Sequence, residues 1–226
     1  MKINNWKINT RFKAIFVLLC FTTLEANAEK FNPISQYLMN GKAVPNWVAY
    51  AGNSMNYFIP LENGDLATKR KSLVIEPIIE NKALSGLYLK WSGKKVKNEW
   101  GGNQLGNTFF SIGRHNIDLS SVEDSAALAL EIKVLRRPNE NVNLSMQCNN
   151  SNKCTGEFPI KNILKSTKKD EWIQLPIPLN CFNRNGDFDF TKVTNVLSIA
   201  TQGKLELEIK SIQLVAMDAG DKGCKV

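Results

Sequence analysis

The feature that most restricts how this chain can fold is a stretch of strictly alternating side chains near its middle. Apolar Leu128, Leu130, Ile132 and Val134 are separated by Ala129, Glu131 and Lys133. A period of two residues is the pattern of a β-strand with one face in a core and the other face in water. Val142–Met146 and Leu205–Ile209 alternate in the same way, so the pattern predicts a domain built largely from strands.

Helix-forming patterns are nearly absent from the rest of the chain. Only Ile160–Ser166 has the spacing of a short helix, whereas about eight to ten short segments separated by turn residues have the character of strands. This arrangement predicts an all-β fold, a β-sandwich of the jelly-roll type. The alternation after Ile209 resumes one residue out of phase at Ile212. Such a slip predicts a β-bulge near Lys210 and Ser211.

The first 28 residues have the layout of a secretory signal peptide. Four basic residues precede the apolar run Ala14–Phe21, and Ala26-Asn27-Ala28 is a small-x-small cleavage site. The apolar run is too short to span a bilayer. We therefore expect an exported protein, periplasmic or extracellular, in which residues 29–226 form a single domain without a membrane span. An uncleaved N-terminal membrane anchor is the alternative.

The expected mature chain carries a modest positive charge. Of the 29 basic and 21 acidic residues, four and one lie in the predicted signal peptide, which leaves 25 and 20 and a net charge of +5. A nucleic-acid-binding protein more often shows a concentrated basic stripe with interleaved aromatic residues. We therefore expect no nucleic-acid partner, and we attribute the charge to solubility and to attraction toward acidic surfaces such as anionic polysaccharide or envelope lipid.

Four cysteines remain once the predicted signal peptide is removed. An even number of cysteines in an exported protein predicts two disulfides, and four cysteines allow three pairings. The short loop between Cys148 and Cys154 is the easiest to close, which leaves Cys181 to pair with Cys224. A zinc site is the alternative, although the spacings are not those of a Cys-x-x-Cys pair.

The polar, glycine-rich loop at residues 93–106 contains the best candidates for ligand binding. Sugar-binding sites in β-sandwiches combine an aromatic ring, which lies against the C–H face of a pyranose, with amide and charged side chains. Trp100 meets this description because Glu99, Asn103 and Gln104 surround it in the sequence. A loop anchor is an equal alternative for the Trp100 ring.

Three further residues complete the predicted carbohydrate-binding set: Trp47, Arg114 and His115. His115, beside Arg114 at the end of a strand, is also typical of an ordinary surface residue. Trp91 shares the apolar face of its strand and is expected in the core. Trp172 is expected to pack against other residues rather than to lie exposed.

The sequence offers little support for catalysis. His115 is the only histidine, and no Gly-x-Ser-x-Gly motif is present. A glycosidase needs two carboxylates a few ångströms apart, so an unrecognised hydrolase is kept as an alternative. Asn183–Asp189 alternates like a calcium loop, but its glycine is misplaced and Thr194 stands where glutamate is required. We expect no cofactor and no metal at this loop, although a structural calcium elsewhere is kept as an alternative because jelly rolls often hold one.

The order and spacing of several segments resemble a known family. The segments are Gly64-Asp65, Leu87–Gly93, Ile117–Ser120, Ala127–Val134, Leu144–Cys148 with Cys154, Trp172 with Pro178–Phe182, and Leu205–Leu214. Together they resemble the galactose-binding-like C-terminal domain, often called the ExoP domain, of bacterial exo-β-glucan glucohydrolases of glycoside hydrolase family three. The likeness covers roughly residues 47–215.

The resemblance implies a jelly roll that assists a glucan-cleaving enzyme. In that family the catalytic barrel lies upstream of this domain, whereas here a signal peptide is expected directly before it, so we expect a free-standing accessory domain. Its predicted function is non-catalytic binding of a polysaccharide or oligosaccharide, β-glucan or exopolysaccharide, with a separate glycoside hydrolase as a candidate partner. The alternative is a structural or protein-interaction protein of the cell envelope that does not bind sugar.

Overall fold

The computed structural model describes residues 31–94, 96–97 and 105–224. The predicted signal peptide lies outside these residues. The described residues belong to one compact unit that begins at Phe31. None of the helices found in them has the length and apolar character needed to cross a membrane.

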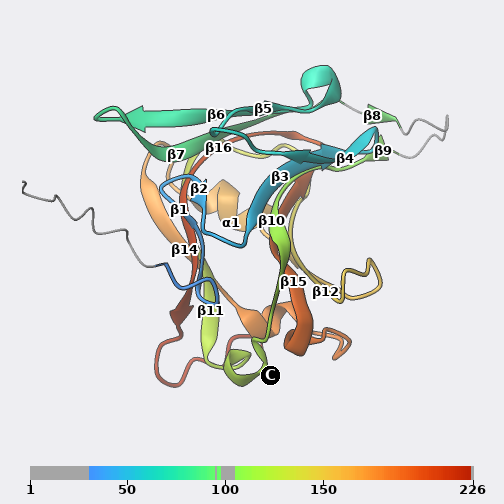
Figure 1. The fold of residues 1–226 in the computed structure, drawn as a ribbon, viewed down its shortest axis with the longest axis vertical. Coiled ribbons are helices and arrows are strands. Elements are labelled where there is room, and N and C mark those ends of the chain that lie inside the picture. The colour runs from blue at the N-terminus through green and yellow to red at the C-terminus, as the bar shows by residue number, and fades with distance from the viewer. Residues whose placement is uncertain (1–30, 95, 98–104, 225–226) are drawn as a thin grey trace, which may run out of the picture. The chain divides into compact units, whose positions relative to one another are not determined.

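Two antiparallel sheets contain nearly all of the described strands (Figure 1). Six strands of the eight-stranded sheet have the order β14-β11-β16-β7-β6-β5. The other two strands of this sheet are β1, which pairs with β16, and β2, which pairs with β1. Its strands are β1 (Gln36–Met39), β2 (Lys42–Ala43), β5 (Leu66–Ala67), β6 (Leu73–Glu80), β7 (Ala83–Ser92), β11 (Ala126–Arg136), β14 (Trp172–Pro178) and β16 (Lys204–Ala216).

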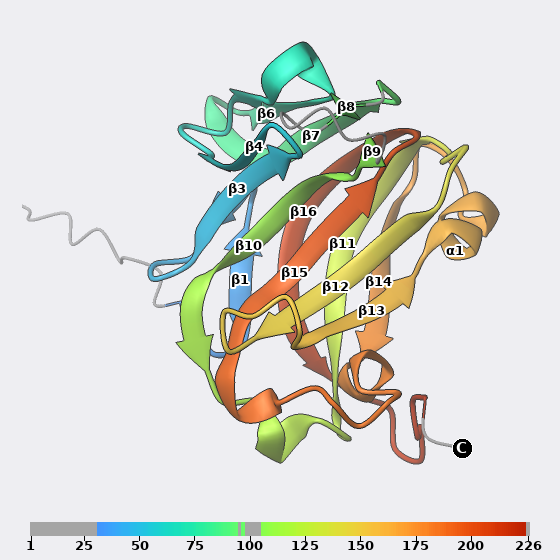
Figure 2. The same cartoon turned by 90° about the vertical axis from the view of Figure 1, so that its right-hand side faces the viewer.

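The six-stranded sheet, which faces the viewer in Figure 2, has the order β13-β12-β15-β10-β3-β4. Its strands are β3 (Val48–Asn53), β4 (Asn56–Pro60), β10 (Thr108–Ile117), β12 (Val142–Cys148), β13 (Thr155–Pro159) and β15 (Val193–Thr201). The pair β8 (Val96–Lys97) and β9 (Leu105–Gly106) stands apart from both sheets. The fold is therefore the all-β sandwich that the strand pattern predicted.

Helices are short and connect strands. The α-helix α1 (Lys161–Ser166) matches the one helical segment that the sequence predicted. The 3-10 helices are η1 (Lys69–Lys71), η2 (Ser120–Val122), η3 (Leu179–Phe182) and η4 (Phe190–Lys192). Because these segments are so short, the fold depends on strand pairing and on the core rather than on helix packing.

The core lies between the two sheets and is filled by the apolar face of each strand. Leu128, Leu130, Ile132 and Val134 of β11 are all at most 1% exposed, which confirms the predicted core face, although Ala129 on the opposite face is also buried. Burying a side chain of this size contributes about 1.5–3 kcal/mol to stability. Trp91 of β7 is also buried, as expected, and its indole N–H donates to the Thr108 carbonyl 3.0 Å away in the other sheet.

The predicted β-bulge in the last strand is confirmed. Glu131 is opposite Ser211 and Ile132 is opposite Ile209, so Lys210 has no partner on β11. The bulge also divides the other edge of β16 between two strands. Residues 204–209 pair with β7, and Ile212 and Gln213 pair with β1. The N–H of Gly41 donates to the Lys210 carbonyl at 3.0 Å, which joins the β1–β2 turn to the bulge.

The prediction that Trp172 packs in the interior was wrong. Its side chain is 39% exposed at the start of β14, an edge strand of the eight-stranded sheet. Trp172 faces away from the core, and the ammonium of Lys133 on the neighbouring strand lies 4.6 Å from its ring centroid. The aliphatic chain of Lys133 and a cation–π contact therefore cover part of the Trp172 ring in place of the expected packing.

Both predicted disulfides are present. Cys148 is bonded to Cys154, and Cys181 is bonded to Cys224. The second bond fixes the C-terminal tail beside η3, where the buried Asn180 side chain also holds the tail. Its amide donates to the Lys222 carbonyl at 3.1 Å and accepts from the Cys224 N–H at 3.0 Å.

Removing the disulfide that closes the longer loop should destabilise the protein more than removing the disulfide that closes the shorter loop. The two pairs are separated by 43 and 6 residues, and loop-closure entropy gives about 4 and 2 kcal/mol, respectively. Equilibrium denaturant unfolding of C181S/C224S and C148S/C154S would measure this order. A larger loss in C148S/C154S would show that native contacts of the short loop outweigh the entropy of the long one.

Candidate functional site

A groove of about 520 Å³ lies on the outer face of the six-stranded sheet. Side chains from β3, β4, β10, β12 and β15 line it, together with the loop between β12 and β13. The inner face of the same strands is apolar and buried. Alternation therefore turns Phe109 and Ser111 of β10, and Ser145 and Gln147 of β12, toward the groove.

The floor of the groove consists of small hydroxyl side chains in one row. Ser145 on β12 is opposite Ser198 on β15, Ser198 is opposite Ser111 on β10, and Ser111 is opposite Tyr50 on β3. Larger residues at these positions would fill the hollow. The row thus keeps the centre of the sheet open and supplies hydroxyl donors and acceptors along it.

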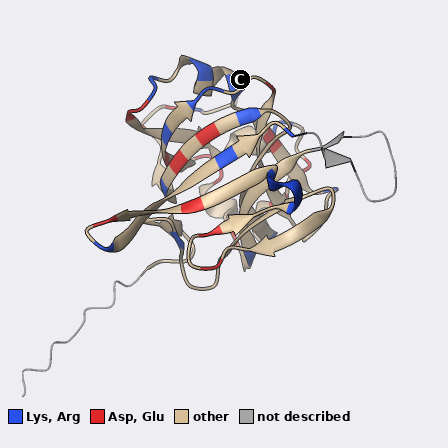
Figure 3. Cartoon of the chain, turned by 90° about the horizontal axis from the view of Figure 1, so that it is seen from above, with Lys and Arg blue, Asp and Glu red and all other residues tan. Residues whose placement is uncertain are grey.

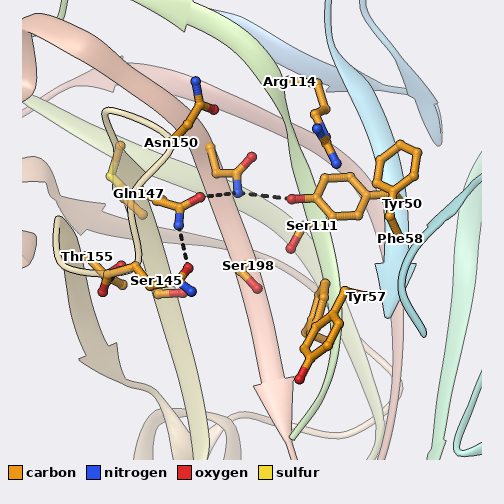
Figure 4. A pocket seen from close by; sticks show the side chains of 14 residues that line it. Tyr50, Tyr57, Phe58, Ser111, Arg114, Ser145, Gln147, Asn150, Thr155 and Ser198 are labelled. Carbon is orange, nitrogen blue, oxygen red and sulfur yellow. Dashed lines mark hydrogen bonds between the residues drawn. The ribbon is translucent and has the colours of Figure 1, made fainter. Parts of the chain in front are cut away.

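A chain of hydrogen-bonded amides crosses the groove next to the serine row (Figure 4). Asn195 donates to the Tyr50 hydroxyl at 2.9 Å and to the Gln147 side-chain oxygen at 3.0 Å, and Gln147 donates to Asn152 at 3.0 Å. Each side chain is held in place by its neighbours, so its remaining donors and acceptors point in fixed directions. Fixed polar groups lose little conformational entropy when they bind a ligand.

Asn195 can take this position only because residue 113 is glycine. Gly113 is opposite Asn195 in the sheet, and a Cβ atom built on Gly113 would lie 1.4 Å from the Asn195 side-chain oxygen. The amide therefore lies directly over the backbone of β10, where any other residue would displace it.

Aromatic rings form the wall of the groove on the side of β3 and β4. Tyr50 and Phe58 have ring centroids 4.9 Å apart, and Phe109 meets Tyr50 edge-on at 6.2 Å. Tyr57 is 70% exposed and Phe58 is 37% exposed, which leaves apolar ring surface open to solvent. Exposed aromatic rings beside ordered amides are the combination that recognises a pyranose ring.

Arg114 is the charged residue among those described along the groove. Its backbone has a φ of +69°, in an irregular stretch of β10 where the register with β15 shifts after Gly113. The guanidinium carbon of Arg114 lies 4.4 Å from the centroid of the Phe58 ring. This contact places a cation and an array of N–H donors at the aromatic wall.

The Cys148–Cys154 loop forms the opposite border of the groove and supplies Asn150 and Asn152. Asp189 fixes this loop because its carboxylate accepts from Asn149 at 3.1 Å. The same carboxylate accepts from the hydroxyl and the N–H of Thr191 at 2.6 and 3.0 Å. The Thr191 hydroxyl and then Asn149 hold the pKa of Asp189 below its usual range.

The sequence-predicted binding residues separate into three groups. Glu99, Trp100, Asn103 and Gln104 lie outside the described residues, so their role stays a prediction. Arg114 lies in the groove.

Trp47 and His115 do not line the groove. The Trp47 ring is 5% exposed, its N–H donates to the Pro33 carbonyl at 2.8 Å, and the half-buried His115 ring meets it edge-on at 5.2 Å.

Sequence reasoning missed most of the groove. The alternation of Val142–Met146 predicted only that the outward face of β12 meets water, and no role was predicted for the outward faces of β10 and β15. A signal was present in the composition of β12, since Asn143, Ser145 and Gln147 are neutral hydrogen-bonding residues, whereas Glu131 and Lys133 of β11 and Glu206 and Glu208 of β16 are charged. In the described part of the chain no group of three His, Cys, Asp or Glu side chains is arranged to hold a metal ion.

Gly113→Ala should break the amide chain without unfolding the protein. The new methyl group would force the Asn195 side chain away from Tyr50 and Gln147, and each lost hydrogen bond costs about 1 kcal/mol. Thermal unfolding would show a modest fall in Tm, and the amide resonances of Asn195 and Gln147 would lose their protection from solvent exchange. An unchanged exchange rate would contradict this account of the groove.

Asp189 should stabilise the protein at neutral pH and lose this effect in acid. Because folding lowers its pKa, the contribution is present above the pKa of the unfolded chain, about 4, and disappears as the pH falls through the lowered folded value. The difference in stability between wild type and Asp189→Asn, measured by denaturant unfolding, should therefore be larger at pH 7 than at pH 3. A difference independent of pH would contradict a role for the charge.

Comparison with solved structures shows the same fold in a domain of a bacterial enzyme. The extra C-terminal domain of exo-1,3/1,4-β-glucanase ExoP from a Pseudoalteromonas species has 16% identity and a TM-score of 0.62, over 85% of this chain and 99% of that domain. Against the larger ExoP chain of the same organism the identity is 18% and the TM-score 0.61, and the match spans 22% of its length.

A carbohydrate-binding module has a similar fold. The family 30 module of the cellulosomal cellulase Cel9D-Cel44B of Clostridium thermocellum has 17% identity and a TM-score of 0.54, over 82% of this chain and 98% of the module. Comparison with curated protein sequences finds no match.

A family model described as galactose-binding domain-like, Exop_C, matches residues 90–214. The match covers more than half of the chain and includes the strands β10, β12 and β15 that form the centre of the groove. It also agrees with the resemblance that the strand and cysteine pattern indicated. The chain belongs to the Exop_C family of galactose-binding-like domains.

Proposed function

We propose that this protein binds a polysaccharide or oligosaccharide in the groove of the six-stranded sheet and does not cleave it. The observation that carries the proposal is the pairing of an exposed aromatic wall, Tyr57 and Phe58, with a floor of serines and fixed amides. The wall offers apolar surface to the C–H face of a sugar ring, and the floor offers partners to its hydroxyls. The size of the groove lies within the usual range for ligand sites.

Binding without hydrolysis is supported by the chemistry of the lining. Glycoside hydrolysis uses two carboxyl groups that flank the scissile bond. The residues described along the groove are neutral apart from Arg114, so none of them supplies a carboxyl group as acid or nucleophile.

The most suitable ligand class is β-glucan. The enzyme that contains the similar ExoP domain is named an exo-1,3/1,4-β-glucanase, and the similar family 30 module belongs to a cellulase. Both names refer to enzymes acting on glucose polymers. A separate glycoside hydrolase as partner, and export of the protein, are part of the same proposal. The two disulfides support export because such bonds persist in oxidising compartments.

Tyr57→Ala should weaken binding to a soluble mixed-linkage β-glucan by about 10-fold or more, because loss of one stacking ring costs about 1.4 kcal/mol or more. Affinity electrophoresis with increasing polymer in the gel would measure the change. Trp172→Ala is the matched control, since Trp172 is also an exposed aromatic residue but lies on the other sheet.

Equal loss in both variants would overturn the assignment of the site to the groove, and no retardation of the wild type by any neutral glucan would overturn β-glucan as the ligand class. Trp100→Ala in the same gel would test the residue that the sequence predicted. A loss with Trp100→Ala and none with Tyr57→Ala would move the site from the groove to the 93–106 loop.

A further inference from the structure

The segment Lys69–Lys71 combines three basic side chains with a strained backbone. Arg70 and Lys71 have φ values of +62° and +51°, in the left-handed region that residues other than glycine seldom occupy. Glycine or asparagine would form such a turn with less strain. Strained turns of this kind persist only where the surrounding structure fixes them, and they are frequent at binding sites.

A buried polar network fixes this turn. Asn53, Thr68, Ser72 and Thr108 are all at most 4% exposed. The Asn53 amide donates to the Lys69 carbonyl and to the Ser72 hydroxyl, each at 3.1 Å. The Ser72 hydroxyl also contacts Thr68 at 2.9 Å and accepts from Thr108 at 3.1 Å. The network joins both sheets, since Asn53 and Thr108 belong to the six-stranded sheet.

One more basic residue contacts the turn, and another is linked to it through Ser92. The Lys94 ammonium donates to the Arg70 carbonyl at 3.2 Å. Lys204 is opposite Ser92 in the sheet, and Ser92 in turn donates to the Lys71 carbonyl at 3.0 Å. The basic turn, defined here as Lys69–Lys71 with Lys94 and Lys204, is exposed throughout, and its first three residues form a blue turn in Figure 3.

Four cations of the basic turn lack an acidic partner among the residues that the structure describes. Within the described ranges, no carboxylate lies at ion-pair distance from Arg70, Lys71, Lys94 or Lys204. The outer face of the eight-stranded sheet is different, because its charges pair across neighbouring strands. Glu206, for example, is 3.9 Å from Lys90 and 3.7 Å from Arg136. Positive charge that is concentrated on a fixed turn and not neutralised nearby attracts anions.

Asn53 connects the basic turn to the groove. Its side-chain oxygen accepts from the N–H groups of Met55 and Asn56 at 2.9 and 3.2 Å, and so shapes the turn from β3 to β4. Its amide group holds the basic turn. Tyr57 and Phe58 of the aromatic wall follow directly on β4. The aromatic wall and the basic turn are thus fixed by one buried side chain.

We propose that the basic turn is an anion-binding site that extends the groove, and that the natural ligand is a polysaccharide carrying carboxylate or sulfate groups. This inference rests on the proposed carbohydrate binding and narrows its ligand. Sugar rings would contact the aromatic wall, and acidic groups farther along the chain would reach the basic turn. Arg114, stacked on Phe58, would add a second cationic contact within the groove.

The test compares an acidic polymer, polygalacturonate, with the neutral mixed-linkage β-glucan on the full-length protein. The variant R70Q/K71Q/K94Q removes three of the four charges and keeps chain length. The control variant K82Q/K165Q/K222Q removes three exposed lysines elsewhere. Titration calorimetry at low salt should show polygalacturonate binding weakened by about 10-fold or more in the first variant, and less than about 2-fold in the control. The salt dependence of binding should also fall only in the first variant.

A second variant, R70G/K71G, tests whether weaker binding results from lost charge rather than from misfolding, because glycine adopts positive φ without strain. It should stay folded and also bind polygalacturonate more weakly. Equal losses in the basic-turn and control variants would overturn the inference. So would an equal loss of neutral glucan binding in the basic-turn variants, which would indicate general damage.

Other polyanions provide the remaining outcomes. Suppose that the protein does not bind polygalacturonate but binds single-stranded DNA, or vesicles with 30% phosphatidylglycerol, through the basic turn. This result would overturn the assignment to an acidic glycan. If the basic-turn variants bind polygalacturonate like the wild type while Tyr57→Ala weakens neutral glucan binding, this inference fails and the proposed function stands. If no glycan of either charge binds, the proposed function itself fails.

Discussion

Burial of one face of every long strand between two sheets is the constraint on which the rest of this molecule depends. Each strand must alternate, so its other face is free to carry a different chemistry. The eight-stranded sheet uses this freedom for charges that pair across neighbouring strands, such as Lys133 and Glu208. The six-stranded sheet uses it for serines, amides and aromatic rings. A single core thus supports one surface suited to water and one suited to a ligand.

The candidate site is organised before any ligand arrives. Asn195 lies over Gly113 and is hydrogen-bonded on both sides, while Asn53 holds two turns from a fully buried position. Buried polar groups that satisfy one another specify one arrangement, because any alternative leaves a donor or an acceptor unpaired. The polar network therefore defines the geometry, whereas the apolar core supplies the stability.

Sequence patterns predicted what depends on local alternation. The buried row of β11, the bulge at Lys210 and the two disulfides follow from the spacing of residues along the chain. The groove could not be predicted in this way because its residues meet only through strand order. Ser145, Ser198 and Ser111 are neighbours since β15 lies between β12 and β10. Trp172 was misassigned for the same reason, because spacing does not show which strand forms an edge.

The position of β16 has a consequence for how the chain folds. This strand ends at Ala216, near the C-terminus, yet it lies between β11 and β7 and also holds β1. Until residues 204–216 have been synthesised, the larger sheet exists only as three separate pieces, β14-β11, β7-β6-β5 and β1-β2, whose exposed edges can pair with other chains. The eight-stranded sheet can therefore be completed only after β16 has been synthesised, and its completion requires long-range contacts, which form slowly. Loss of the C-terminal strand would thus leave sheet fragments with unpaired edges that are prone to aggregate, rather than a shortened but folded domain.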